Sequence, residues 1–159
     1  MRATWDETWM KVAEAMSKRA KCTNRQVGAV VVDGNNRPIS VGYNGEPAGY
    51  KHSQWQSCSA FCQRSTANTG DRGATYKNCI SVHAEANALI FADRAQYVGG
   101  TIYVTNPCCW DCSKLVANSG IARVVFRQTQ ADAHADVQSS IEFLESCGLQ
   151  VEVWKQEEK

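Results

Sequence analysis

The stretch TIYVTNPCCWDCSKLVANSG, residues 101–120, indicates a strand followed directly by a helix. Residues 101–105 are rich in β-branched and aromatic side chains, which favour a strand, and residues 109–119 have helical character that ends at Gly120. Three cysteines lie at the junction: Cys108, Cys109 and Cys112. A strand followed at once by a helix is half of a βαβ unit, so this stretch predicts a sheet with helices packed on it.

The same alternation runs through the rest of the chain. Helical spacing of apolar residues predicts helices over 5–20, 83–95, 109–119 and 132–147. Runs of β-branched residues bounded by turn residues predict strands over 27–32, 38–43, 101–105, 123–126 and 151–154. Asp33-Gly34 joins the first two strands as a hairpin. We therefore expect an α/β fold in a single domain spanning 1–159, with a mixed sheet flanked by helices.

A long insertion separates the second strand from the second helix. Between about residue 46 and residue 80, Gly, Ser, Thr and Gln are frequent and no periodicity is sustained. A loop of this length within a compact domain is uncommon unless something functional orders it.

The composition is that of a globular domain with little net charge. The 159 residues are 43% hydrophobic and 21% charged, which is enough for a real core. Lys and Arg total 17 against 16 Asp and Glu, which argues against binding of a nucleic-acid backbone through global charge. No apolar run approaches the ~20 residues of a membrane helix, and the acidic start is unlike a signal peptide, so we expect a cytoplasmic location. Eight cysteines in such a compartment favour metal binding over disulfides.

Two short motifs stand at the heads of consecutive helices. One is His83-Ala84-Glu85 and the other is Cys109-Trp110-Asp111-Cys112. Residues three apart on a helix face the same way, and a helix N-terminus favours the thiolate form of cysteine. Two thiolates and one imidazole balance the charge of Zn²⁺ and leave its fourth position open for water. Glu85 points to another side of its helix, so it is better placed to carry protons than to bind the metal.

His-x-Glu followed by Pro-Cys-x-x-Cys is the signature of zinc-dependent deaminases. With these motifs the chain resembles the cytidine deaminase superfamily and, within it, the dCMP deaminases of bacteria and phages. The resemblance covers nearly the whole chain, and its landmarks are RQVGA (25–29), GYNGEPAG (42–49), VHAEANA (82–88), IYVT (102–105) and SGI (119–121). It implies a three-layer α/β/α fold with a five-stranded sheet. It also implies hydrolytic deamination of dCMP to dUMP, which supplies thymidylate synthesis.

The resemblance also implies roles for individual residues. Glu85 would move protons at the base, Asn44 would hydrogen-bond the sugar, and Ala84 would contact the substrate. Asn44 follows a strand at a tight loop, where asparagine is also a common turn residue. Arg25 is our candidate for the cation that pairs with the 5′-phosphate, with a solvated surface position as the alternative.

Members of this family are typically hexamers that dCTP activates and dTTP inhibits, with an arginine at the position of Arg94 that contacts the effector. We therefore expect a homo-oligomer with nucleotide effectors, and Mg²⁺ accompanying a bound triphosphate. Arg94 closes the helix that begins at His83, and a basic residue in a last helical turn also complements the helix dipole. For Phe91, on the same stretch, we expect core packing.

Some dCMP deaminases of this branch hold a second, structural zinc ion. Four candidate ligands lie in the corresponding regions of this chain, in or beside the insertion: Cys22, His52, Cys58 and Cys79. A closed site of four ligands would order a loop that lacks the apolar residues to order itself. Scattered buried thiols and a surface histidine are the alternative.

The chain departs from the signature at one point, because Pro107-Cys108-Cys109 offers two candidates for the first sulfur ligand. The adjacency of Pro and Cys favours Cys108, whereas the spacing to Cys112 and the distance from the preceding strand favour Cys109. We prefer Cys109, since ligand geometry constrains zinc more tightly than the preceding proline does. Cys108 would then be a small buried packing residue.

Three other functions fit parts of the pattern. A deaminase of tRNA or single-stranded DNA needs a cationic track and stacking aromatics, and here Trp55 and Trp110 are present but the charge balance offers little track. A modified dCMP, or dCTP, is an alternative substrate. A non-catalytic zinc module would enclose its metal with four ligands and would have no use for Glu85.

Overall fold

A five-stranded mixed sheet forms the centre of the protein. The computed structural model describes residues 2–22, 24–50, 79–129 and 137–155. Its strands are β1 (Gly28–Val32), β2 (Pro38–Tyr43), β3 (Thr101–Val104), β4 (Arg123–Arg127) and β5 (Gln150–Trp154), in the order β2-β1-β3-β4-β5. β1 is antiparallel to both β2 and β3, whereas β3, β4 and β5 are parallel to one another. Four strands therefore point the same way and β1 runs against them, which confirms the predicted mixed sheet.

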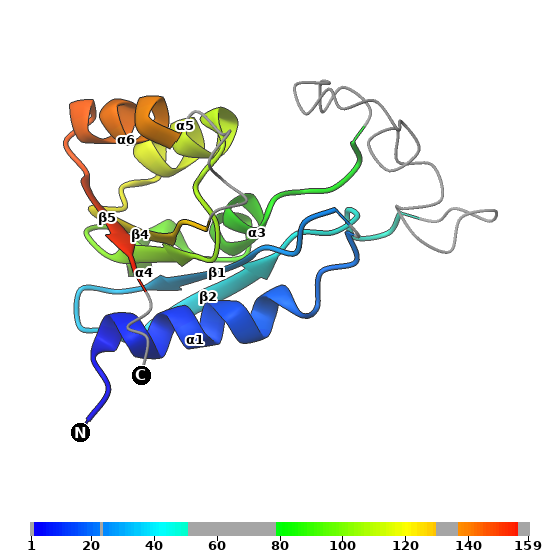
Figure 1. Cartoon of the computed structure of the whole chain (residues 1–159), viewed down its shortest axis with the longest axis horizontal. Helices are drawn as coiled ribbons and strands as arrows, with labels where there is room; N and C mark the ends of the chain where they lie inside the picture. The colour runs from blue at the N-terminus through cyan, green and yellow to red at the C-terminus, as the bar shows by residue number, and fades with distance from the viewer. Residues whose placement is uncertain (1, 23, 51–78, 130–136, 156–159) are drawn as a thin grey trace.

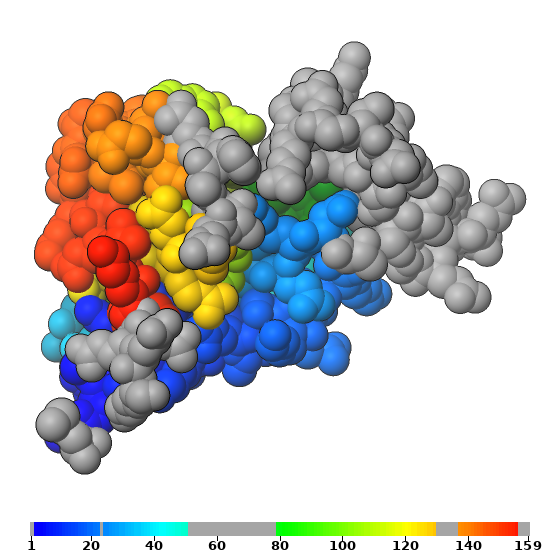
Figure 2. Space-filling model, viewed as in Figure 1, coloured from blue at the N-terminus to red at the C-terminus, as the bar shows by residue number. Residues whose placement is uncertain are grey.

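Helices cover both faces of this sheet. They are α1 (Trp5–Ser17), α3 (Ala84–Ile90), α4 (Arg94–Tyr97), α5 (Trp110–Ser119) and α6 (Val137–Ser146). α1 lies on one face, and α3, α5 and α6 lie on the other (Figure 1). The space-filling view likewise places α1 and α6 on opposite sides of the molecule (Figure 2). None of the helices in the described part of the chain combines the length and the apolar character that a membrane crossing requires.

The core consists of two layers, one on each side of β1. All five residues of β1 are buried, as expected for a strand covered on both faces. Ala29 and Val31 pack in the cluster that includes α3 and α5, while Val30 and Val32 pack in the cluster that includes α1. The alternation of side chains along a strand thus divides an uninterrupted apolar run between the two layers.

The helix expected over 83–95 is divided in two. α3 ends at Ile90, and the Asp93 carboxylate then accepts a hydrogen bond from the backbone N–H of Ala95, 2.9 Å away, and so begins α4. An aspartate N-cap competes with continuation of a helix because it satisfies the first N–H groups of a new one. Arg94 therefore starts α4 and does not lie in the last turn of α3. Phe91 is 73% exposed, so the expectation that it packs in the core is wrong.

Gly42 on β2 allows α3 to lie directly on the sheet. A Cβ atom at this position would overlap the carbonyl oxygen of Ala84 and would come within 2.5 Å of the backbone nitrogen of Ala88. Helix and strand therefore touch backbone to backbone, with no side chain between them. Since α3 begins beside His83, this contact fixes the height of the motif above the sheet.

The Gly42→Ala substitution is expected to destabilise the protein by about 1–3 kcal/mol, because α3 has to move away from β2 to admit the methyl group. Gly34→Ala is the matched control, since a Cβ atom at the exposed Gly34 meets nothing within 4 Å. Chemical denaturation of both variants measures the free energy of unfolding. Equal stability of the two variants would contradict the close contact.

Candidate active site

The heads of α3 and α5 meet at one edge of the sheet. α3 follows β2 in the chain and α5 follows β3 directly, and these two strands point the same way because each is antiparallel to β1. The carboxyl ends of such strands share an edge, which is where α/β folds place their ligands. The two sequence motifs therefore come from different crossovers to the same place.

His83 is the N-cap residue of α3, and its side chain makes no capping hydrogen bond. The preceding residue, Val82, is paired with Gly45 by two backbone hydrogen bonds of 2.8 and 3.1 Å. On the helix itself, Asn87 donates from Nδ2 to the carbonyl oxygen of Tyr43 over 2.8 Å. These contacts tie both sides of His83 to the end of β2, so the position of the imidazole is set by backbone pairing.

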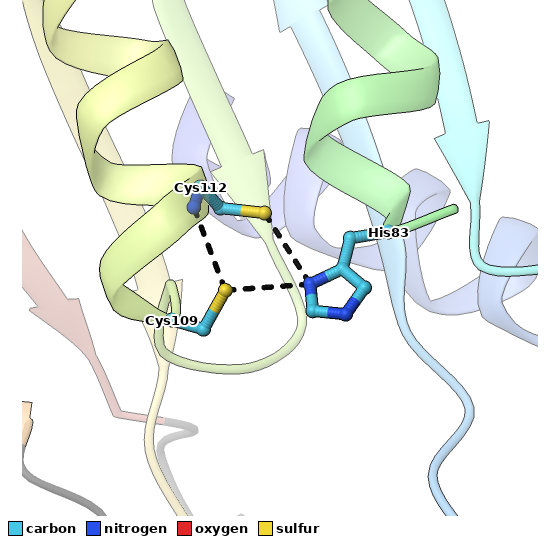
Figure 3. Close-up of side chains that lie close together, drawn as sticks. All are labelled: His83, Cys109 and Cys112. Atoms are coloured by element: carbon cyan, nitrogen blue, oxygen red, sulfur yellow. Dashed lines mark hydrogen bonds between the residues drawn. The ribbon is translucent and has the colours of Figure 1, made fainter. Parts of the chain in front are cut away.

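The two cysteines come from the first turn of α5. Cys109 is the N-cap, and its sulfur accepts a hydrogen bond from the backbone N–H of Cys112 over 3.5 Å. The Nδ1 atom of His83 lies 3.4 Å from the sulfur of Cys109 and 3.4 Å from that of Cys112 (Figure 3). The three ligand atoms all lie within 4.8 Å of one another.

The spacing of these atoms fits a tetrahedral zinc site. Zn–S bonds of ~2.3 Å and Zn–N bonds of ~2.0–2.1 Å place a ligand nitrogen about 3.6 Å from a ligand sulfur. The observed 3.4 Å agrees with this separation. In the described part of the chain no fourth histidine, cysteine or carboxylate joins the group. Two sulfurs and one imidazole that leave a fourth position open are typical of a catalytic zinc site.

The electrostatics of the three groups also suit a cation. The neighbouring thiol of Cys112, together with His83, lowers the pKa of Cys109 to about 4. The sulfur of Cys109 in turn raises the pKa of Cys112 and, through its contact with the imidazole, the pKa of His83. A bound cation would compete with protons for these three groups.

Glu85 lies in the first turn of α3, two residues after His83, and is only 4% exposed. Burial is the main cause that raises the pKa of its carboxyl group. A buried carboxyl group beside a metal site, outside the set of ligands, is suited to accept and return protons.

Two of the three candidate substrate residues are buried and the third is exposed. Asn44 is 6% exposed; its Oδ1 atom accepts from the backbone N–H of Val27 over 2.8 Å, and its Nδ2 atom donates to the carbonyl oxygen of Arg25 over 2.9 Å. Asn44 therefore holds the segment that carries Arg25, whose side chain is exposed. Ala84, the first residue of α3, is fully buried.

The other predicted residues that the structure describes do not belong to the metal-ligating group. Cys22 and Cys79 are half-buried free thiols, while His52 and Cys58 lie outside the described residues. Arg94 is exposed, with its guanidinium group over Gly120, where a Cβ atom would approach Nη2 to 2.9 Å. Cys108 is 4% exposed and does not belong to the metal-ligating group.

Sequence reasoning missed two residues that position the site. Asn87 ties α3 to β2, and Thr105 accepts a hydrogen bond on Oγ1 from the backbone N–H of Gly28 over 3.0 Å. Each is a polar residue inside an apolar pattern, and Thr105 is 1% exposed. A buried polar residue is normally paired, so this interruption of the pattern is the signal that could have identified them.

Comparison with known proteins agrees with this geometry. Residues 3–128 match the family described as the cytidine and deoxycytidylate deaminase zinc-binding region. The chain belongs to this family. It is 41% identical to the deoxycytidylate deaminase of Mycobacterium phage D29 over 125 residues, which cover 79% of this chain and 95% of the phage protein. The deoxycytidylate deaminase of Schizosaccharomyces pombe is 32% identical over 94% of this chain, which spans 44% of the yeast protein.

A solved structure also resembles this deaminase-family protein. The dCMP deaminase of cyanophage S-TIM5, in complex with dCMP and dUMP, superimposes with a TM-score of 0.68 at 29% identity. The alignment covers 97% of this chain and 99% of the phage chain. The resemblance inferred from the sequence, to dCMP deaminases within the cytidine deaminase superfamily, is thereby confirmed.

Loss of a ligand is expected to remove one zinc ion per chain. Cys109→Ser and Cys112→Ser each replace a sulfur of the cluster by a poorer ligand, so both should lower the zinc content measured by elemental analysis. Cys108→Ser and Cys147→Ser are the controls and should retain zinc, since neither residue belongs to the metal-ligating group. Zinc loss in Cys108→Ser, with zinc retained in Cys109→Ser, would reverse the choice of ligand.

Proposed function

We propose that this protein catalyses hydrolytic deamination of dCMP to dUMP, with release of ammonia. The observation that carries the proposal is the buried carboxyl group of Glu85 beside a group of two sulfurs and one imidazole that lacks a fourth ligand in the described part of the chain. The named activities of the phage D29 and yeast relatives, and the dCMP and dUMP bound to the S-TIM5 enzyme, support dCMP as the substrate.

His83, Cys109 and Cys112 are the residues that would hold Zn²⁺. When bound at such a site, zinc supplies an acidic water, whose pKa falls to about 7, and it neutralises the charge of the two thiolates. The hydrogen bond from the backbone of Cys112 to the sulfur of Cys109 orients that ligand and is independent of the metal.

Glu85 carries the protons of the reaction. Its carboxylate accepts a proton from the water that adds to C4 of the base, and returns it to ring N3. It then accepts the second proton of the same oxygen and passes it to the departing amine, so that the carboxylate is regenerated. Burial favours the protonated form of Glu85 in the middle of this cycle, because it raises the pKa of the carboxyl group.

The loop around Asn44 would receive the rest of the nucleotide. Asn44 keeps one amide hydrogen and one oxygen lone pair beyond its two backbone contacts, and these are the groups it would offer to the sugar. Arg25, on the segment that Asn44 holds, supplies the cation for the 5′-phosphate. Ala84, the first residue of α3, would contact the substrate at the start of that helix.

Glu85→Gln is expected to bind zinc normally and to lose about 10²–10⁴-fold in kcat for dCMP, because an amide cannot carry protons. Assays of wild-type protein with dCMP, dCTP, cytidine and an oligonucleotide, under the same conditions, test the substrate assignment. Turnover of dCMP should exceed that of the others. Full activity of Glu85→Gln would end the proposal, and preferred turnover of the oligonucleotide would favour a nucleic-acid deaminase.

We further propose regulation by dCTP as activator and dTTP as inhibitor, with Mg²⁺ accompanying the triphosphate, in a homo-oligomer such as a hexamer. Arg94 is exposed at the start of α4, where it is available to a phosphate. Apolar side chains nearby are also exposed: Ile90, Phe91 and Val98. An exposed apolar group of this kind is typical of an interface between subunits.

Rates with dCMP in the presence of each effector test this regulation. dCTP should raise the rate and dTTP should lower it, and Arg94→Ala should weaken both responses because it removes the cation. An unchanged wild-type rate with both nucleotides would contradict allosteric control in this protein.

A second, structural zinc site at Cys22, His52, Cys58 and Cys79 stays a prediction, as does a cytoplasmic location. The zinc measurement described above also tests the second site, since wild-type protein with this site holds two zinc ions per chain.

A further inference from the structure

The chain segments that follow β2 and β3 bind the start of β1 from both sides. On the β2 side, the backbone N–H of Asn44 donates to the carbonyl oxygen of Val27 over 3.2 Å, and Oδ1 of Asn44 accepts from the backbone N–H of Val27. On the β3 side, the backbone N–H of Thr105 donates to the carbonyl oxygen of Gly28 over 3.0 Å, and Oγ1 of Thr105 accepts from the backbone N–H of Gly28. Asn44 and Thr105 therefore occupy equivalent positions at the sheet edge that carries the metal-ligating group.

The contact between Thr105 and Gly28 sets the direction of the next hydrogen bond. A backbone N–H can only donate, so Oγ1 of Thr105 is an acceptor in this contact and keeps its own proton. Thr105 donates that proton to Oδ1 of Asn106, 3.2 Å away. Because the amide oxygen of Asn106 faces Thr105, its NH₂ group faces away from Thr105.

The NH₂ group of Asn106 has no partner among the residues that the structure describes. The side chain is half-buried and lies in the short segment between the end of β3 and Cys109, the first sulfur ligand. This segment is at the carboxyl edge of the sheet, where α/β folds bind their ligands. A ligand site orients its occupant through a small number of fixed polar groups, and Asn106 offers such a donor here.

We propose that Asn106 is a substrate-binding residue, whose NH₂ group donates a hydrogen bond to an oxygen of the nucleoside part of dCMP. The inference rests on the proposed function, which takes dCMP as the substrate. Asn106 shares the start of β1 with Asn44, the residue proposed for the sugar, and it lies three residues before Cys109, a ligand of the metal that would face the base. Both neighbours favour a nucleoside oxygen over an oxygen of the 5′-phosphate.

Two substitutions separate substrate binding from a purely structural role. Asn106→Asp keeps an oxygen that accepts from Thr105 and replaces the NH₂ group by a second oxygen, whereas Asn106→Ala removes both groups. If Asn106 only accepts the proton of Thr105, aspartate is tolerated and alanine is not. If Asn106 donates to the substrate, both variants lose affinity. Aspartate then loses at least as much as alanine, because a carboxylate repels both an acceptor oxygen and the charge of the nucleotide.

Calorimetric titration of zinc-loaded protein that carries Glu85→Gln measures binding of dCMP without turnover. Adding Asn106→Ala should raise the Kd for dCMP about fivefold, the factor that a hydrogen bond of ordinary net strength supplies, and Asn106→Asp should raise it by at least as much. Deoxycytidine, which has no phosphate, should show the same fold-change.

Asn118→Asp is the control with the same change of charge. Asn118 is exposed near the end of α5, whereas Cys109 caps the start of that helix. This variant should leave the Kd for dCMP unchanged. All of the variants should retain the zinc content of the parent protein.

Three results would overturn the proposal. They are an unchanged Kd in Asn106→Ala, a loss of affinity in the alanine variant that the aspartate variant does not share, and a loss for dCMP that deoxycytidine does not share, which would assign Asn106 to the phosphate. Zinc loss in Asn106→Ala would also overturn it, because the effect would then act through the metal. Failure of the proposed function is distinguishable, since in that case the wild-type protein does not deaminate dCMP.

Discussion

The structure of the site depends on one contact, in which a single imidazole nitrogen lies 3.4 Å from two cysteine sulfurs that are 26 and 29 residues distant in the chain. Such a contact requires two helix heads to meet. The reversed direction of β1 brings them to one sheet edge, and the absence of a side chain at Gly42 lets α3 lie low enough to reach α5. The backbone pair between Val82 and Gly45 then fixes the histidine itself.

The same two helix starts supply both the ligands and the proton carrier. The N-cap position places Cys109 where the backbone of α5 stabilises its negative charge, and the first turn of α3 places Glu85 where burial opposes negative charge. The surroundings therefore lower the pKa of the Cys109 thiol and raise the pKa of the Glu85 carboxyl group. One group is therefore prepared to bind a cation and the other to hold a proton.

Much of this architecture follows from the sequence. The uninterrupted β-branched run in β1 indicates a strand buried on both faces, and the paired motifs at helix heads indicate a shared site. The break before Arg94 was missed because alanines continue the helical spacing through it, although Asp93 begins a new helix. The contacts of Asn44 and Val82 join segments that are distant in sequence, and no local pattern encodes them.

Anomalous diffraction at the zinc absorption edge, from crystals of the purified protein, is the decisive test of the metal centre because it locates each metal ion separately. We expect a peak bounded by Nδ1 of His83 and the sulfurs of Cys109 and Cys112, with a water molecule as the fourth ligand. A peak enclosed by a fourth side chain at this position, or no peak there in zinc-replete protein, would contradict a catalytic metal centre.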